Sequence, residues 1–203
     1  MKFRLGFIML SLACVYILSA CAGTSTPQAT QAIVDTATLQ ATPVGLPTST
    51  EEPKVSIIDL LPNIEYPIDI TSTGKAKLVN GVFEEPAAPG SATKTQVQLT
   101  KELATGDING DGFEDALVLL VADPGGSGTF TYLALVLNDN GNPKPIASVL
   151  LGDRIIVKSL AIQDGQVVVK LLTRKPDEPM SAKPTVDVTR IFNLEGDRLH
   201  EVK

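Results

Sequence analysis

The sequence is poor in the side chains that most active sites and disulfide-held folds require. It contains no tryptophan, one histidine and two cysteines among 203 residues. Because the only histidine is His200, close to the C-terminal end, a Ser-His-Asp triad would have to use this residue, and a histidine-rich zinc site cannot form. The scarcity of aromatic residues also disfavours a sugar-stacking cleft. We therefore expect His200 to be a solvated side chain and the protein not to be an enzyme.

Long hydrophobic runs are scarce too, and the most extended one lies at the N-terminus. Lys2 and Arg4 precede an apolar stretch from Phe7 to Leu18, and small residues follow it. A charged start, about a dozen apolar residues and a small-residue exit are typical of a secretory signal and fall short of the ~20 residues that span a bilayer. Residues 1–20 are therefore predicted to be a signal peptide.

The exit of this segment, "LSAC", ends on Cys21 and resembles the lipobox of bacterial lipoproteins. The resemblance implies that Cys21 is acylated with diacylglycerol and becomes the first residue of the mature chain. An ordinary signal peptide cut near Ala20 or Ala22 is the alternative, but it would leave an exported protein with one unpaired cysteine. Acylation leaves no thiol and no disulfide in the folded part, which its core or a metal must then stabilise.

The predicted lipid determines the expected location of the mature protein, and removal of the signal peptide determines its charge. We expect an anchor on the outer face of the cytoplasmic membrane or on the outer membrane, which Ala22 after Cys21 permits. Loss of Lys2 and Arg4 leaves 15 basic and 23 acidic side chains, a net charge of −8. A protein with this acidic charge is not expected to have the basic surface that binds the phosphate groups of nucleic acids. Nucleic acid is therefore not expected as a partner.

The mature chain divides into a polar tether and a folded domain. Residues 22–50 contain eight threonines, two serines, three prolines and one charged residue. Such a segment cannot bury enough apolar surface to offset the entropy of ordering it. We therefore predict that residues 21–54 form a lipidated, disordered Thr/Ser/Pro-rich tether. A single domain is expected to occupy residues 55–203.

The pattern of the domain is that of strands and hairpins. Asn80-Gly81 between two apolar pairs is a strong hairpin signal, and "TKTQVQLT" alternates with the period of a half-buried strand. The run "DALVLLVA" is continuously apolar, as in a strand covered on both faces. Helical spacing is confined to "VSIIDLLP". The sequence predicts an all-β fold, mainly antiparallel and hairpin-rich, sandwich or barrel-like, with eight to ten strands and at most one short helix.

The stretch "GDINGDGFEDALVLLV" concentrates oxygen-bearing side chains in one loop before an apolar run. Asp107, Asn109, Asp111 and Asp115 occupy loop positions 1, 3, 5 and 9, and Phe113 occupies position 7. Ca²⁺ takes six to eight oxygens at about 2.3–2.6 Å, which a coiled loop supplies from alternate side chains and a backbone carbonyl. The spacing predicts a structural Ca²⁺ site made by these four side chains and the Phe113 carbonyl.

The D-x-N-x-D-G-x-x-D pattern of this loop resembles the calcium loops of FG-GAP and integrin-α-type repeats and of dockerin-like modules. It departs from the EF-hand because position 12 is Val118 instead of glutamate and a strand pattern follows. The resemblance implies calcium binding, but the pattern occurs once and does not predict a propeller. A "GGSGTF" segment from Gly125 to Phe130 adds a likeness to bacterial lipoproteins with such a loop before it, which implies no particular activity.

Both glycine-rich loops have a simpler interpretation as turns. In the acidic loop, Asn109-Gly110 and Asp111-Gly112 could supply positive φ values. That alternative leaves the carboxylates of Asp107 and Asp115 to repel each other without a counterion. The later stretch "DPGGSGTF" lacks the Lys-Ser/Thr ending and the helix of a phosphate-binding loop, and we predict a turn there.

These features favour an exported, lipid-anchored protein whose calcium-stabilised β domain is a binding or structural module of the cell envelope. A hydrolase of envelope polymers and a subunit of a larger envelope assembly are the alternatives. A cleft lined by converging carboxylates away from residues 107–115 would favour the hydrolase, and a flat apolar patch beside "TRKPDEPMSAKP" would favour the assembly. The expected partners are the membrane, through the lipid on Cys21, and an envelope protein or polymer.

Overall fold

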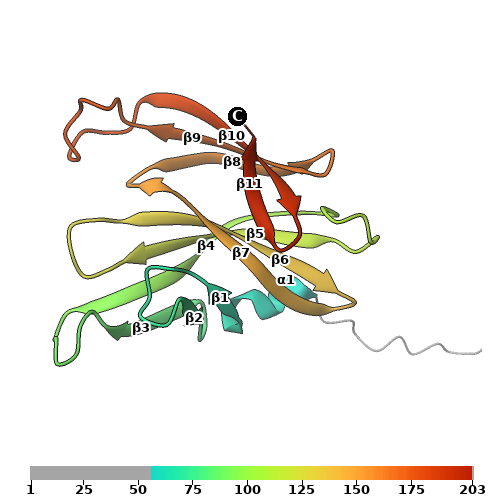
Figure 1. Cartoon of the computed structure of the whole chain (residues 1–203), viewed down its shortest axis with the longest axis horizontal. Helices are drawn as coiled ribbons and strands as arrows, with labels where there is room; N and C mark the ends of the chain where they lie inside the picture. The colour runs from blue at the N-terminus through green and yellow to red at the C-terminus, as the bar shows by residue number, and fades with distance from the viewer. Residues whose placement is uncertain (1–55, 203) are drawn as a thin grey trace, which may run out of the picture. The chain divides into compact units, whose positions relative to one another are not determined.

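The computed structural model describes residues 56–202 of the chain (Figure 1). The predicted signal peptide, residues 1–20, and the predicted lipidated tether, residues 21–54, lie outside the described residues. The described part corresponds to the predicted β domain. No helix within it is long and apolar enough to cross a bilayer.

Strands dominate the domain, and the predicted all-β, mainly antiparallel fold with at most one short helix is confirmed. Eleven strands form three antiparallel sheets in the described part, where one short helix continues into a 3₁₀ turn. The strand count exceeds the expected eight to ten. Two of the strands have only three residues, too few for a periodic pattern to reveal. The elements are α1 (Ile57–Leu60), η1 (Leu61–Asn63), β1 (Glu65–Pro67), β2 (Lys75–Lys77), β3 (Val82–Pro86), β4 (Lys94–Gly106), β5 (Asp115–Asp123), β6 (Phe130–Asp139), β7 (Asn142–Asp153), β8 (Ile156–Gln163), β9 (Gln166–Thr173), β10 (Val186–Glu195) and β11 (Arg198–Val202).

A five-stranded sheet in the order β3-β4-β5-β6-β7 forms the middle layer of the domain (Figure 1). Its central strands are covered on both faces, as the apolar run "DALVLLVA" predicts. Because side chains alternate along a strand, Val118 and Leu120 of β5 point into one cluster, whereas Leu117 and Leu119 point into another. All four are almost completely buried. Two separate cores therefore share one sheet.

The N-terminal elements cover the first face. Ile57 of α1 and Leu61 of η1 pack on this face together with Tyr66 of β1 and Ala76 of β2. The Tyr66 hydroxyl donates a hydrogen bond to the Leu61 carbonyl at 3.0 Å, so this buried ring has a partner for its polar end. The short helix and the two-stranded sheet therefore act as one cover over the middle sheet.

A four-stranded sheet in the order β11-β10-β9-β8 covers the second face. Val167 and Val169 of β9 and Phe192 of β10 are buried against the middle sheet. The two sheets come into close contact where β4 passes β8. A Cβ atom added to Gly106 would lie 3.0 Å from the Cβ of Ile162, so glycine permits the contact at that point.

The hairpin turn at Asn80-Gly81 follows the predicted sequence signal. Asn80 and Gly81 both have positive φ, 52° and 83°, and the residues on either side of them form a bridge. Asn140-Gly141 and Asp164-Gly165 repeat this left-handed pair between β6 and β7 and between β8 and β9. Two consecutive positive φ angles match the twist of a two-residue hairpin. These dipeptides therefore set where the strands reverse.

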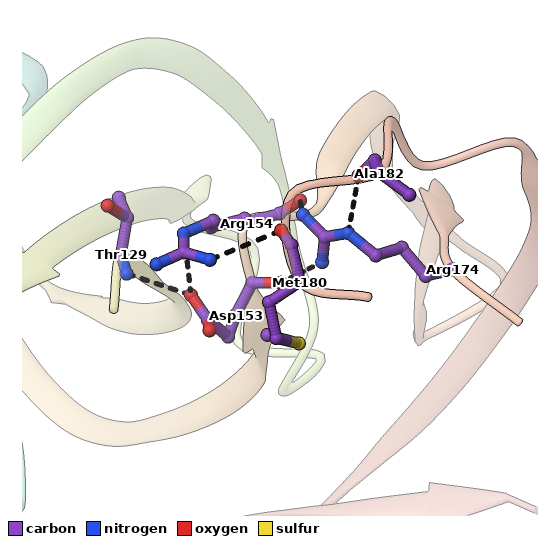
Figure 2. A network of polar contacts seen from close by, with 6 residues as sticks. All are labelled: Thr129, Asp153, Arg154, Arg174, Met180 and Ala182. Atoms are coloured by element: carbon purple, nitrogen blue, oxygen red, sulfur yellow. Dashed lines mark hydrogen bonds and ion pairs between the residues drawn. The ribbon is translucent and has the colours of Figure 1, made fainter. Parts of the chain in front are cut away.

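An arginine pair holds the long loop between β9 and β10 against the end of β7 (Figure 2). Arg174 donates to the Ala182 carbonyl at 2.6 Å and to the carbonyls of Asp153 and Arg154 at 3.2 Å. Arg154 donates to the Met180 carbonyl at 3.2 Å. The guanidinium groups thus bind carbonyls of the loop and of the end of β7. They give this irregular loop a fixed path.

A third arginine joins the two larger sheets. Arg190 of β10 forms a two-pronged ion pair with Glu201 of β11, at 2.8 and 2.7 Å, and lies 5.0 Å from the Phe192 ring centre. Its remaining terminal nitrogen donates to the carbonyls of Leu150 and Leu151 in β7, at 3.2 and 3.0 Å. The side chain is only 18% exposed. Arg190 therefore links the last strand of the middle sheet to the sheet that covers it.

Replacing Arg190 should weaken this link. Arg190→Met keeps the aliphatic stem but removes the hydrogen bonds to two β7 carbonyls, and we expect the free energy of unfolding to fall by about 1–3 kcal/mol in urea titrations. Lys158→Met is the control, because the Lys158–Asp187 pair is at least half exposed on both sides and should contribute less than about 1 kcal/mol. Equal losses in the two variants would contradict the role given to Arg190.

Candidate metal site

The acidic loop connects β4 to β5 at one end of the middle sheet. Gly106 and Asp115 are the last paired residues of these strands, so the ladder itself closes the loop. Ile108 turns inward and is buried in the core shared with the four-stranded sheet. The loop is therefore anchored at its base and at one internal position.

Asp107 accepts hydrogen bonds from three backbone amides of its own loop. One carboxylate oxygen accepts from Gly110 at 2.7 Å and Asp111 at 3.2 Å, and the other accepts from Gly112 at 2.9 Å. These donors stabilise the ionised form, and the Gly112 amide is the main reason that the pKa of Asp107 is lowered. Gly110 and Gly112 have φ values of 79° and 86°, which few other residues adopt. The loop is therefore coiled around the carboxylate of Asp107.

Asn109 and Asp111 extend the coil, because their side-chain oxygens also accept hydrogen bonds from backbone amides of the loop. The Asn109 side-chain oxygen accepts from the Asp111 amide at 3.1 Å, and one Asp111 oxygen accepts from the Phe113 amide at 2.8 Å. The Asn109 side-chain nitrogen donates to the other Asp111 oxygen at 2.8 Å. Asn109 and Asp111 are exposed, and Phe113 is half-buried. The predicted ligands at positions 1, 3, 5 and 7 therefore belong to one continuous, water-facing turn.

Asp115 differs from the other carboxylates because it is completely buried. Its two oxygens accept from the backbone amides of Ile108, at 3.0 Å, and Asn138, at 2.8 Å. Burial is the main cause that raises its pKa, and the negative charges of Asp111 and Asp107 raise it further. Asp115 thus fastens the loop to β6, while it experiences the repulsion of the other two carboxylates.

Asn138 completes the connection to the β6–β7 hairpin. Its side-chain nitrogen donates to the Glu114 carbonyl at 3.1 Å, and its side-chain oxygen accepts from the Gly141 amide at 2.7 Å. Sequence reasoning missed Asn138 and the inward-facing Ile108. Neither belongs to the alternating pattern of oxygen ligands, and Asn138 lies 23 residues from its partner Asp115.

A hollow of about 210 Å³ lies between the loop and the β6–β7 hairpin. Asn109 and Asp111 border it on one side, and Asn138, Asp139 and Lys144 border it on the other. Among the described residues Lys144 has no ion-pair partner. Asp139 is a further oxygen donor that the spacing within the loop could not predict. Most of the side chains around this hollow offer oxygen, the element that a hard cation prefers.

The oxygen ligands of the loop suit calcium, and the hydrogen bonds within the loop are also those that a simple polar turn would make. The loop offers carboxylate, amide and carbonyl oxygens, and no histidine or cysteine that would favour a softer metal. Within residues 56–202 no three acidic, histidine or cysteine side chains converge as a metal-ligand set. The carboxylates are directed at backbone amides, and each oxygen keeps a second lone pair. Asp107, Asp111 and Asp115 remain near enough for the first two to raise the pKa of the third.

Two further predictions concern the glycine-rich stretch between β5 and β6 and the only histidine. The stretch from Asp123 to Phe130 connects two strands through a turn, in which Asp123 accepts a hydrogen bond from the Gly125 amide at 2.8 Å. His200 lies in β11 with its side chain 52% exposed, 3.9 Å from a Glu195 oxygen. The predicted turn and the solvated histidine are both confirmed.

Comparison with known proteins gives no family for the chain: no family model, no curated protein and no solved structure matches it.

The burial of Asp115 predicts that it stabilises the fold even without metal. In EDTA, Asp115→Ala should lower the free energy of unfolding by about 2 kcal/mol or more, because it leaves two amides without an acceptor at ~1–3 kcal/mol each when buried. Asp111→Ala is the matched control in the same loop: Asp111 is exposed, and its loss should change stability by less than about 1 kcal/mol. Urea titration measures both, and equal small losses would contradict the stabilising role of the Asp115 hydrogen bonds to Ile108 and Asn138.

Proposed function

We propose that the chain is an exported lipoprotein, anchored through Cys21, whose β domain is stabilised by calcium and acts as a binding or structural module of the cell envelope. The observation that carries the calcium part is that Asp107 and Asp111 of the coiled loop lie near enough to the buried Asp115, at the start of β5, for their charges to raise its pKa. A divalent cation would relieve that repulsion.

Calcium suits the loop better than other common ions. Ca²⁺ accepts irregular shells of oxygen ligands that include backbone carbonyls, whereas Mg²⁺ requires a compact octahedron and zinc prefers nitrogen and sulfur. The proposed ligands are the side chains of Asp107, Asn109, Asp111 and Asp115 and the Phe113 carbonyl. Water would complete the shell.

The affinity expected of this ligand set is low but sufficient outside a cell. Three carboxylates, one amide and one carbonyl correspond to the ~10⁻⁴–10⁻³ M dissociation constants of extracellular calcium modules. At ten times the dissociation constant, the bound ion would add about 1.4 kcal/mol to stability. An increment of that size matters for a domain that has no disulfide.

The role of the ion is structural in this proposal. The loop contains no histidine, cysteine, serine or lysine between Gly106 and Asp115, and the aspartates that could otherwise act as a base or a nucleophile would be occupied as ligands of the ion. It does join two hairpins, because Asp115 accepts from Asn138 and Asn138 donates to Glu114. Ion binding would therefore stabilise the end of the middle sheet where β5 begins and β6 ends.

The anchoring part of the proposal depends on the sequence alone. The apolar leader, the "LSAC" exit and the solitary mature cysteine support lipidation of Cys21. The polar composition of residues 22–54 supports a tether that holds the β domain near the membrane without burying it there.

Calcium should raise the melting temperature of the full chain. We expect millimolar Ca²⁺ to stabilise the wild-type protein by about 1–2 kcal/mol relative to EDTA, measured by calorimetry. Asp111→Asn should abolish the calcium response, because it removes one of the ligand charges while keeping an acceptor for the Phe113 amide. Asp187→Asn, a charge loss on β10 outside the loop, is the control and should leave the response intact.

The calcium response should also depend on pH in a defined direction. Binding requires ionised Asp115, whose pKa is raised in the folded protein. The calcium-dependent stabilisation should therefore be complete at neutral pH and be lost as the pH falls through the raised pKa of Asp115. A melting temperature that is the same in calcium and EDTA at neutral pH would favour the polar-turn interpretation.

Lipidation makes a separate prediction about Cys21. Mass spectrometry of the protein from native bacterial membranes should show a diacylglyceryl group on Cys21 at the new N-terminus. Cys21→Ser should give an uncleaved precursor or a soluble species, because serine offers no thiol for the lipid. An unmodified Cys21 in the native protein would contradict the anchor and would leave the calcium proposal unaffected.

A further inference from the structure

A groove of about 450 Å³ lies along the outer edge of β7, on the opposite side of that strand from β6. Its floor is the stretch from Ile146 to Ser148. The turn after β1 supplies one wall, and the β10–β11 hairpin supplies the other. The edge of the middle sheet is therefore recessed between the layers that cover its two faces. The volume is within the ~300–1,000 Å³ of ligand-binding clefts.

Both ends of the β7 edge are blocked, and the floor of the groove is not. Pro143 and Pro145 remove backbone donors at one end, and Arg190 donates to the carbonyls of Leu150 and Leu151 at the other. β7 pairs only with β6. Among the described residues, no backbone hydrogen bond joins Ile146–Val149 to an element other than β6. Proteins normally protect a sheet edge along its length, so an unprotected segment inside a groove indicates a docking position.

One detail of this segment supports a missing partner. The register between β6 and β7 shifts at Ile146, which lies between the paired residues Pro145 and Ala147 and so is the extra residue of a bulge. Bulges redirect the groups beside a binding site.

The walls carry more negative than positive charge. Asp69 lies on the wall after β1, where one of its oxygens accepts a hydrogen bond from the Tyr132 hydroxyl at 2.8 Å. Asp197 and Arg198 lie on the opposite wall, and neither forms an ion pair with a described residue. An occupant with a positive charge would therefore meet a carboxylate on each wall. The Asp69 carboxylate is engaged by the Tyr132 hydroxyl, so the two do not form the free, converging carboxylate pair that would favour a hydrolase.

We propose that this groove binds an extended peptide segment, which adds as a strand to β7 and places a basic side chain between Asp69 and Asp197. Strand addition uses the backbone of an exposed sheet edge for affinity and side-chain pockets for specificity. At ~3.3 Å per residue, the three floor residues can pair with about three residues of the peptide. None of the described residues that line the groove is aromatic, so none can stack on a sugar ring. This inference refines the proposed binding role and is independent of the calcium site.

Amide hydrogen exchange on the full chain tests the proposal, with capped hexapeptide pools as probes. In each pool five positions are randomised and a central position is fixed as Lys or Glu. The Lys pool, at millimolar total concentration, should slow exchange at those amides of Ile146–Val149 that point away from β6. The Glu pool should protect these amides about fivefold more weakly, the upper end for an exposed ion pair. A Lys pool with alternate backbone nitrogens methylated should give no protection, because it cannot pair with the edge.

A double variant, Asp69→Asn with Asp197→Asn, tests the charge preference. It should make the two pools bind alike. Asp164→Asn in the β8–β9 turn is the control, because it removes one charge outside the groove from a position with φ of 52° that asparagine adopts readily. The variant should keep the preference for lysine.

Three results would overturn strand addition. One is no protection of Ile146–Val149 by any pool, and another is equal protection by the methylated pool. The third is protection by lysine amide alone or by oligosaccharides, which would indicate a small-cation site or a sugar cleft. Each measurement is made in calcium and in EDTA, so failure of the groove and failure of the calcium site are distinguishable.

Discussion

Burial of both faces of β5 and β6 is the constraint on which the rest of this domain depends. A strand with apolar side chains on both sides must be covered twice, and here α1 with β1 and β2 covers one face while the four-stranded sheet covers the other. Since the cysteine predicted to be lipidated lies outside the domain and no disulfide is available, these two cores hold the fold together. The double cover also places the edge of β7 in a groove, because a layer projects on each side of it.

The same constraint explains the position of the acidic loop. Asp115 is the first residue of β5 and is buried because the strand that follows it is buried. A carboxylate at that depth requires hydrogen-bond donors, which Ile108 and Asn138 supply from the loop and from β6. The negative charges of Asp107 and Asp111 then act on a carboxylate that water cannot screen well. Packing buries the Asp115 carboxylate, and the neighbouring negative charges oppose its ionisation. Calcium binding would therefore stabilise the protein at this point.

Local signals made much of the structure predictable. The Asn80-Gly81 pair identified one hairpin, and period-two or continuous apolar patterns identified half-buried and buried strands. The coil around Asp107 follows from alternate polar residues and two glycines within one short segment. The hydrogen bond from the Asn138 amide to the Asp115 carboxylate could not be predicted, because it depends on which strands pair and in what register. The groove at β7 brings together three distant segments, and the two three-residue strands are too short to have a pattern of their own.

Isothermal titration of the full chain with calcium chloride at neutral pH is the most direct test of the proposed calcium site. The account predicts one ion per chain with a dissociation constant of about 10⁻⁴–10⁻³ M, and no binding heat for Asp111→Asn under the same conditions. Binding of the same strength by that variant would place the ion elsewhere. Absence of binding heat from the wild-type protein at several millimolar calcium would show that the loop is only a turn, and the calcium site would have to be abandoned.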